Sequence, residues 1–131
     1  MSDHLNSPTT PDEQGRVTVE ADVVYGAGGG RDLHCDIYRP PGTSADQPGH
    51  GHPCVVLVHG GAWRTGDRSQ LRGYGIRLGR AGYVGVAVEY RLTPESPWPA
   101  QIHDVKAAMR SGSIPRRSAL ARTHLTAAFT S

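Results

Sequence analysis

Two stretches near the start of the chain alternate apolar and polar side chains. Valine and alanine alternate with Thr, Glu and Asp over residues 17–23, and Leu33, Cys35 and Ile37 alternate with polar neighbours. A period of two is typical of a strand with one face exposed to water. The glycine-rich segment 26–30 lies between them and indicates a turn. We therefore expect an antiparallel hairpin that ends at Pro40 and Pro41, since proline lacks the N–H that strand pairing needs.

Two later stretches are apolar without alternation, residues 54–58 (CVVLV) and 83–90 (YVGVAVEY). Such runs are typical of parallel strands that are covered on both faces. Apolar residues then recur every three or four positions over 71–81 and over 98–109, the spacing of one face of a helix. In the second of these helices Pro99 suits the first turn, and Trp98, Ile102, Val105 and Met109 mark the apolar face. The order strand, helix, strand, helix predicts an α/β sheet.

The two ends of the chain lack this patterning. Residues 1–15 are rich in Ser, Thr, Pro and Asp, which bury too little surface to order a segment. Residues 111–131 contain no apolar run and no acidic side chain, whereas arginine recurs there. We expect a disordered tail at 1–15, a folded part at 16–110, and an aberrant, disordered or weakly helical tail at 111–131.

Composition narrows the class of protein. The chain has 131 residues, of which 37% are hydrophobic and 20% charged, as expected for a single globular domain. Its net charge of +2 is too small to indicate a nucleic acid or an anionic membrane as partner. No run approaches the ~20 apolar residues of a membrane span. Cys35 and Cys54 are too few for a disulfide framework, which favours a reducing interior and a cytoplasmic location.

The chemistry-bearing segment is VHGGAW, residues 58–63, at the end of the first apolar run. A buried strand that runs into a glycine pair leaves backbone N–H groups unpaired at the carboxyl end of the sheet. Only glycine lets a substrate carbonyl approach that backbone closely. Fixed N–H donors aimed at a developing alkoxide form an oxyanion hole, and each typically contributes about 3 kcal/mol.

The order of VHGGAW, GDRS, YVGVAVEY and YRLTPESPWPAQIHDVKAAMR resembles the α/β-hydrolase superfamily. Within it, residues 17–110 resemble the N-terminal part of carboxylesterases related to hormone-sensitive lipase and to feruloyl-esterase-like hydrolases. The resemblance implies oxyanion-hole donors at Gly61 and Ala62, with Gly60 allowing the turn. His59 would orient that turn, and Trp63 would line the acyl pocket. It further implies a serine esterase of small-molecule substrates that uses neither metal nor cofactor.

The chain departs from that family at the nucleophile. The family serine sits in a Gly-x-Ser-x-Gly elbow, followed by an acid and a histidine, and no such elbow occurs in this sequence. No catalytic residue is therefore present, and we expect a truncated or frameshifted hydrolase, inactive alone, with a reading-frame shift near Arg110. A non-catalytic pseudoenzyme or interaction fragment is the alternative. Without the nucleophile-elbow half, strand 54–58 becomes an apolar, aggregation-prone edge.

Other sequence features favour ordinary structural roles. His50, His52 and His59 lack a supporting carboxylate, so solvated histidines are favoured over a metal site. Segment 26–30 has Arg31 where a dinucleotide loop needs its third glycine, which favours a hairpin turn. Asp104 and Glu95 are expected to lie on a helix surface or to anchor a loop. The basic tail has a single phenylalanine and no stacking pattern, so nucleic-acid binding is not expected.

Overall fold

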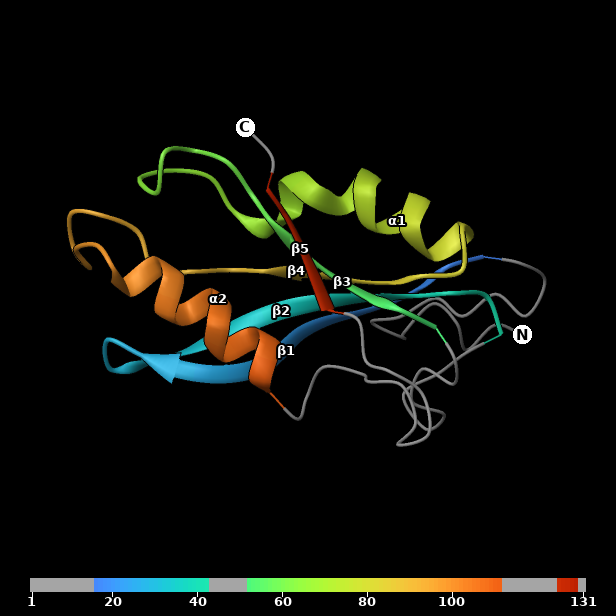
Figure 1. Cartoon of the computed structure of the whole chain (residues 1–131), viewed down its shortest axis with the longest axis horizontal. Coiled ribbons are helices and arrows are strands. Elements are labelled where there is room, and N and C mark those ends of the chain that lie inside the picture. The colour runs from blue at the N-terminus through green and yellow to red at the C-terminus, as the bar shows by residue number, and fades with distance from the viewer. Residues whose placement is uncertain (1–15, 43–51, 112–124, 130–131) are drawn as a thin grey trace, which may run out of the picture.

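The computed structural model describes residues 16–42, 52–111 and 125–129. These residues form a mixed sheet with a helix on each face (Figure 1). The strands lie in the order β1, β2, β4, β3, β5. The elements are β1 (Thr18–Gly28), β2 (Arg31–Arg39), β3 (Cys54–Val58), a short 3₁₀ helix η2 (Arg68–Leu71), α1 (Arg72–Arg80), β4 (Val84–Val88), α2 (Ala100–Arg110) and β5 (Leu125–Phe129).

The predicted hairpin is confirmed. Strands β1 and β2 pair antiparallel from Thr18 opposite Arg39 to Gly28 opposite Arg31. Gly29 and Gly30 turn the chain with φ of +59° and +80°, a backbone conformation that glycine adopts without steric cost. Segment 26–30 is therefore a strand end and a hairpin turn, as the sequence favoured over a dinucleotide loop.

The two continuous apolar runs form the predicted parallel pair. Strand β3 pairs parallel with β4, and β4 pairs antiparallel with β2, which joins the hairpin to the parallel strands. Because successive side chains point to opposite faces, Val56 and Val86 enter one core cluster while Leu57 and Ala87 enter the other. Helix α2 covers the first face and α1 the second.

Glycines determine how closely α1 approaches the sheet. A Cβ added at Gly75 would lie 2.4 Å from the Tyr38 ring, and one added at Gly79 would lie 2.6 Å from the Val17 side chain. Both glycines are buried. The glycines that weaken this helix locally thus let its backbone pack closely against the side chains of Tyr38 in β2 and of Val17 just before β1.

Helix α2 begins later than the apolar pattern predicts. Its first residue is Ala100, with Pro99 at the N-cap, so Trp98 precedes the helix and is 57% exposed. Placing Trp98 on the buried helix face was therefore wrong. Val105 and Ala108 fill that face instead, because Pro97 and Pro99 bracket Trp98 and keep it in a turn.

Residues 125–129 correct the expectation for the C-terminal segment. They form β5, which pairs parallel with β3 from Cys54 opposite Leu125 to Val58 opposite Phe129. In this structure β3 is therefore not an edge strand, contrary to prediction. The free N–H and C=O groups along β3 offer a pairing partner to a segment with little strand pattern of its own. Residues 1–15, 112–124 and 130–131 of the proposed tails lie outside the described part.

Within the described ranges, no helix is long and apolar enough to cross a membrane.

Candidate functional site

The turn after β3 carries three successive residues in positive-φ conformations. The φ angles are +131° at Gly61, +56° at Ala62 and +66° at Trp63. The Gly61 carbonyl accepts hydrogen bonds from the N–H groups of Arg64 and Thr65 at 3.0 and 3.1 Å, which closes the turn. A Cβ at position 61 would lie 2.0 Å from the Thr65 carbonyl oxygen. Glycine is therefore required at position 61, both for its φ and for the close approach of the backbone.

Three N–H groups of this turn have no acceptor within the described ranges. Among the described residues, no hydrogen bond uses the N–H of Gly60, Gly61 or Ala62. Gly60 and Gly61 are partly buried and Ala62 is exposed. Backbone donors left unpaired beside the end of a buried strand are poised for an external acceptor.

His59 holds the start of the turn. It is buried, and its Nδ1 lies 2.8 Å from the Gly60 carbonyl oxygen, so Nδ1 carries the proton and donates. The Tyr90 ring stacks on the imidazole with centroids 4.3 Å apart, and the Tyr90 hydroxyl donates to the His59 carbonyl at 2.7 Å. Burial raises the pKa of Tyr90, which keeps this donor protonated. These contacts fix the peptide from which the turn leaves the strand.

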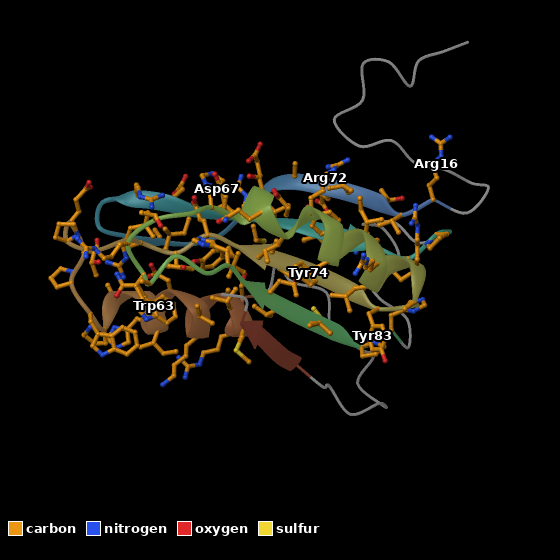
Figure 2. The ribbon with its side chains drawn as sticks, turned by 90° about the horizontal axis from the view of Figure 1, so that it is seen from above. Arg16, Trp63, Asp67, Arg72, Tyr74 and Tyr83 are labelled. Atoms are coloured by element: carbon orange, nitrogen blue, oxygen red, sulfur yellow. The ribbon has the colours of Figure 1, made fainter. Side chains whose placement is uncertain are left out.

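Trp63 joins the turn to the loop after β4. Its ring meets Tyr90 edge-on at 5.1 Å between centroids and lies 5.6 Å from the Trp98 ring. Its carbonyl accepts a 2.8 Å hydrogen bond from the N–H of Thr93. The half-buried Trp63 and the exposed Trp98 thus form an aromatic border next to the turn (Figure 2 marks Trp63).

Asp104 anchors the loop that carries Trp98. The carboxylate accepts from the Arg91 N–H at 2.8 Å and pairs with the Arg91 guanidinium at 2.7 Å. Its hydrogen bond and charge raise the pKa of Arg91. Gln101 donates to the carbonyls of Arg91 and Ser96 at 2.9 and 2.7 Å. The loop-anchoring role expected for Asp104 is confirmed, whereas Glu95 is an exposed loop residue.

The GDRS segment closes the other side of the turn. Gly66 has φ +96°, and a Cβ there would lie 2.8 Å from His59 Nδ1 and 2.7 Å from the Gly60 carbonyl. Asp67 caps η2 by accepting from the Ser69 N–H at 2.7 Å, and it also accepts from the Ser69 hydroxyl. These hydrogen bonds hold the pKa of the Asp67 carboxyl below its usual value. Gly66 is thus packed directly against the buried base of the turn.

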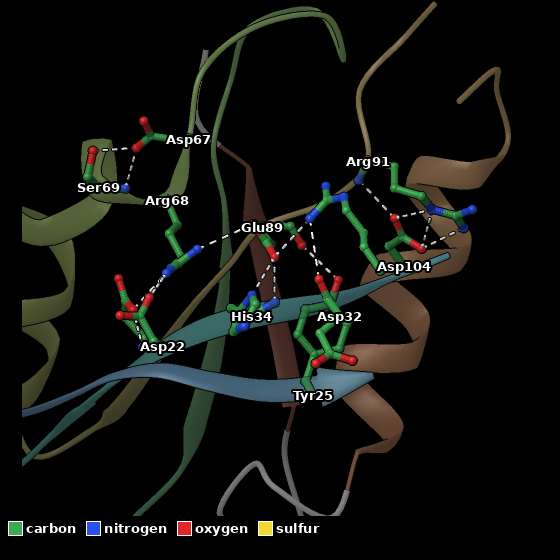
Figure 3. A network of polar contacts seen from close by, with 12 residues as sticks. Asp22, Tyr25, Asp32, His34, Asp67, Arg68, Ser69, Glu89, Arg91 and Asp104 are labelled. Atoms are coloured by element: carbon green, nitrogen blue, oxygen red, sulfur yellow. Dashed lines mark hydrogen bonds and ion pairs between the residues drawn. The ribbon is translucent and has the colours of Figure 1, made fainter. Parts of the chain in front are cut away.

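Arg68 links this segment to the sheet through three carboxylates (Figure 3). Its guanidinium bonds Asp36 at 3.0 Å and Glu89 at 3.3 Å, and it also pairs with Asp22. Glu89 in turn accepts from the His34 N–H at 2.6 Å. The network ties the start of η2 to β2 and to the end of β4, so the segment after the turn has a fixed position.

The structure brings the five predicted site residues, 59–63, into one turn. Sequence reasoning expected Asp104 to anchor a loop but missed the other residues that hold the turn, namely Tyr90, Thr93 and Arg68. Position 90 ends an apolar strand in a tyrosine, which was the one available signal for a buried hydroxyl. His52 binds the Gly82 carbonyl at 2.7 Å, away from His59, while His50 lies outside the described residues. In the described ranges no His, Cys, Asp and Glu cluster could hold a metal.

The BD-FAE family model matches residues 35–111, more than half of the chain. The chain belongs to the BD-FAE family. Esterase LipQ of Mycobacterium tuberculosis is 36% identical over 107 residues, which are 80% of this chain and 24% of LipQ. This BD-FAE chain thus spans about a quarter of that relative.

Solved structures agree with the family. The hyperthermophilic esterase of Pyrobaculum calidifontis is 33% identical with a TM-score of 0.58, over 70% of this chain and 28% of that one. The thermophilic esterase Est2 of Thermogutta terrifontis is 26% identical with a TM-score of 0.62, over 76% and 34%. The resemblance to α/β-hydrolases of carboxylesterase type is confirmed, and so is the partial α/β-hydrolase sheet with its antiparallel hairpin and parallel strands.

Proposed function

We propose that the turn at residues 59–63 is the oxyanion hole of a carboxylic-ester hydrolase. Gly61 and Ala62 present the donor N–H groups, Gly60 allows the turn, His59 orients it and Trp63 borders the acyl pocket. The observation that carries this proposal is the set of N–H groups at the carboxyl end of β3 that pair with no group in the described part of the chain. Its support is geometric, because the bonds to the Gly61 carbonyl and the buried His59 hold these donors before any substrate arrives.

In the reaction that the family implies, an activated serine attacks the carbonyl of a small-molecule ester. The developing oxyanion accepts from the two N–H groups, an acyl-enzyme forms as the alcohol leaves, and water releases the acid. No Gly-x-Ser-x-Gly segment occurs in these 131 residues. We therefore propose that this chain carries the electrostatic part of the site and does not turn over esters alone.

The position of β5 is relevant to this proposal. The family resemblance assigns the place beside β3 to the strand that precedes the nucleophile, and β5 pairs with β3 there. A side chain at the carboxyl end of a strand in that place would lie on the same sheet edge as the turn, since parallel strands end at one edge. The residues after Phe129 lie outside the described part. The cytoplasmic location expected from the sequence stays a prediction.

An anion titration tests the oxyanion hole without needing turnover. Methylphosphonate, a small anion, is added to the ¹⁵N-labelled protein, and backbone amide shifts are followed with chloride at equal ionic strength as reference. We expect the amide signals of Gly61 and Ala62 to shift most. Shifts spread over the arginine-rich surfaces, with these two amides unchanged, would contradict the proposal.

Two alanine variants test whether the anion response depends on the geometry of the turn. Gly61→Ala places a Cβ against the Thr65 carbonyl, so the amide response of the turn should be lost. Gly30→Ala strains a φ of +80° in the hairpin turn with no atom within 4 Å, so it serves as a matched control that keeps the response. Equal responses in both variants would show that the geometry of the turn is not what binds the anion.

An ester assay separates an inactive chain from an active one. Purified protein is incubated with a short-chain p-nitrophenyl ester, with and without a serine-directed phosphonate. We expect ester hydrolysis to stay at the background rate, with no difference between samples with and without the phosphonate. Phosphonate-sensitive turnover would overturn the inactivity, whereas an anion response without turnover fits the non-catalytic alternative.

A further inference from the structure

The solvent face of α1 is basic. Residues 68–88 contain four arginines and no Asp or Glu. Three of these arginines, Arg72, Arg77 and Arg80, lie exposed on α1. Within the described part of the chain, no ion pair or hydrogen bond engages their guanidinium groups. This charge is therefore free to attract an anionic partner.

A hollow of about 400 Å³ runs between this helix and the edge strand β1. Arg72 and Arg80 stand on its helix side, at positions i and i+8, and Arg16 lies at its β1 side. Its floor is aliphatic and includes Val17, Val19 and Ile76. No acidic residue lines it. The hollow thus combines an apolar base with a positively charged border.

Exposed tyrosines lie on the other flank of the helix. Tyr74 and Tyr83 are 52% and 39% exposed. Figure 2, which looks onto α1, shows Arg16 and Arg72 along one flank and Tyr74 and Tyr83 along the other. Tyrosine is favoured where an apolar phase meets water, because its ring is apolar and its hydroxyl is polar. Arginines and tyrosines therefore share one face of the molecule.

We propose that this face, called here the α1 face, docks on the surface of an anionic phospholipid bilayer. Lipid phosphates would meet the guanidinium groups, while acyl chains and the aliphatic floor of the hollow would share an apolar contact. A nucleic acid fits less well, because aliphatic side chains cannot stack on bases and no aromatic ring lines the hollow. The inference does not depend on the proposed oxyanion hole.

The expectation of no membrane partner rested on the net charge of the whole chain. The net charge of +2 does not reveal the positive charge on the α1 face. The acidic side chains Asp22, Asp36 and Glu89 pair with Arg68 and do not neutralise the arginines of that face. A peripheral surface of this kind needs no spanning helix.

Vesicle sedimentation tests the proposal on the full chain. Vesicles of phosphatidylcholine alone are compared with vesicles containing about one third phosphatidylglycerol. We expect binding to the anionic vesicles only, and release as salt rises from about 0.15 to about 0.5 M, because salt screens surface charge. Equal binding to both vesicle types, or binding to neither, would overturn the proposal.

Neutralising variants locate the surface. Each arginine near an anionic bilayer contributes about fivefold in partitioning, so Arg72→Gln/Arg80→Gln should lose on the order of 30-fold. Lys106→Gln/Arg110→Gln removes the same charge from exposed positions on α2, on the opposite face of the sheet, and should lose less than about twofold if contact is made through the α1 face. Circular dichroism checks that both variants are folded. Similar losses in both would contradict docking through the α1 face.

A competition experiment tests whether the α1 face prefers an anionic bilayer to another polyanion. A double-stranded oligonucleotide is added as competitor at phosphate concentration equal to that of the anionic lipid. We expect it to leave most of the protein on the vesicles, and Tyr74→Ala to weaken vesicle binding without changing any oligonucleotide binding. Full displacement by the oligonucleotide, together with no effect of Tyr74→Ala, would replace the bilayer with a nucleic acid as the partner.

Discussion

The Tyr90 hydroxyl donates a 2.7 Å hydrogen bond to the carbonyl of His59, while the two rings stack 4.3 Å apart. One side chain from the segment just after β4 thus contacts both the backbone and the ring of the residue that begins the turn. The geometry of the unpaired N–H groups at Gly61 and Ala62 depends on this contact, because the turn leaves the strand at His59.

Tyr90→Phe should therefore destabilise the protein by about 2 kcal/mol, since it leaves the His59 carbonyl buried without that donor. Urea unfolding followed by circular dichroism measures the change. Tyr83→Phe removes a hydroxyl from an exposed ring and should change the free energy of unfolding by less than about 0.5 kcal/mol. Equal effects of the two variants would mean that the hydrogen bond to His59 contributes nothing.

Asp104→Ala should lower the free energy of unfolding more than Tyr90→Phe does. The Asp104 side chain is 4% exposed and pairs with both the N–H and the guanidinium of Arg91. Its loss leaves these donors without their acceptor and should lower the free energy of unfolding by about 3 kcal/mol. Proteolysis should then cut faster within residues 91–98. Glu95→Ala, in the same loop but exposed, is the matched control and should leave both stability and cleavage unchanged.

The sequence predicts most of the sheet because the relevant signals are local. Alternation identified β1 and β2, and continuous apolar runs identified β3 and β4, since each pattern reports which faces of a strand are buried. Strand β5 was missed because its pairing depends on the open edge of β3, more than sixty residues earlier in the chain. Trp98 was misplaced because the apolar spacing extends one turn beyond the helix, which begins at Ala100 after the N-cap Pro99.

The candidate site also has one part that local sequence predicts and another part that it does not. The turn at residues 59–63 follows from a strand that ends in two glycines, a signal contained in five residues. Its supports come from residues outside the turn, such as Tyr90 from the loop after β4 and Arg68 from η2. No spacing rule links those residues to His59, so only the folded structure reveals them.

Two glycines of α1 distinguish close packing from local helix propensity. Gly75→Ala brings a Cβ to 2.4 Å from the Tyr38 ring, whereas Gly73 has no atom within 4 Å of an added Cβ. Alanine improves helix propensity by about 1 kcal/mol at either site. We expect Gly73→Ala to stabilise by up to about 1 kcal/mol, and overpacking to make Gly75→Ala net destabilising by about 1–2 kcal/mol. Thermal unfolding of both variants measures the contrast, and stabilisation by both would show that α1 can move away from the sheet at little cost.

Stability should fall with rising pH in alkaline solution because of Cys35. Burial, with a smaller effect from the Asp36 carboxylate, raises the pKa of this thiol to about 12. The thiol of an unfolded chain has a pKa of about 8.5. Above that value the unfolded state binds fewer protons than the folded state, so the free energy of unfolding decreases by up to about 1.4 kcal/mol per pH unit.

Urea unfolding of the wild type and of Cys35→Ala between about pH 8 and pH 10 measures that slope. The variant is less stable at neutral pH, since it leaves a cavity, but its slope should be shallower. Burial also raises the pKa of Tyr25. Tyr25 is present in both the wild type and Cys35→Ala, so its effect on the pH slope cancels when the two slopes are subtracted. Parallel slopes would contradict a buried, protonated thiol at position 35.

Strand β5 should protect β3 from pairing with other molecules. Replacing residues 125–129 with alternating glycine and serine removes the strand propensity of the segment that bonds Cys54–Val58, at a cost of about 3 kcal/mol. The exposed apolar edge should then recruit a second chain, because unpaired N–H and C=O groups template strand addition. Light scattering and size-exclusion chromatography should record species of higher mass than the unmodified chain forms, increasing with protein concentration. The same replacement at residues 117–121 is the control, and its mass distribution should match that of the unmodified chain. A variant at 125–129 with the same mass distribution and the same unfolding transition as the unmodified chain would mean that the β3–β5 ladder contributes nothing to the native state in solution.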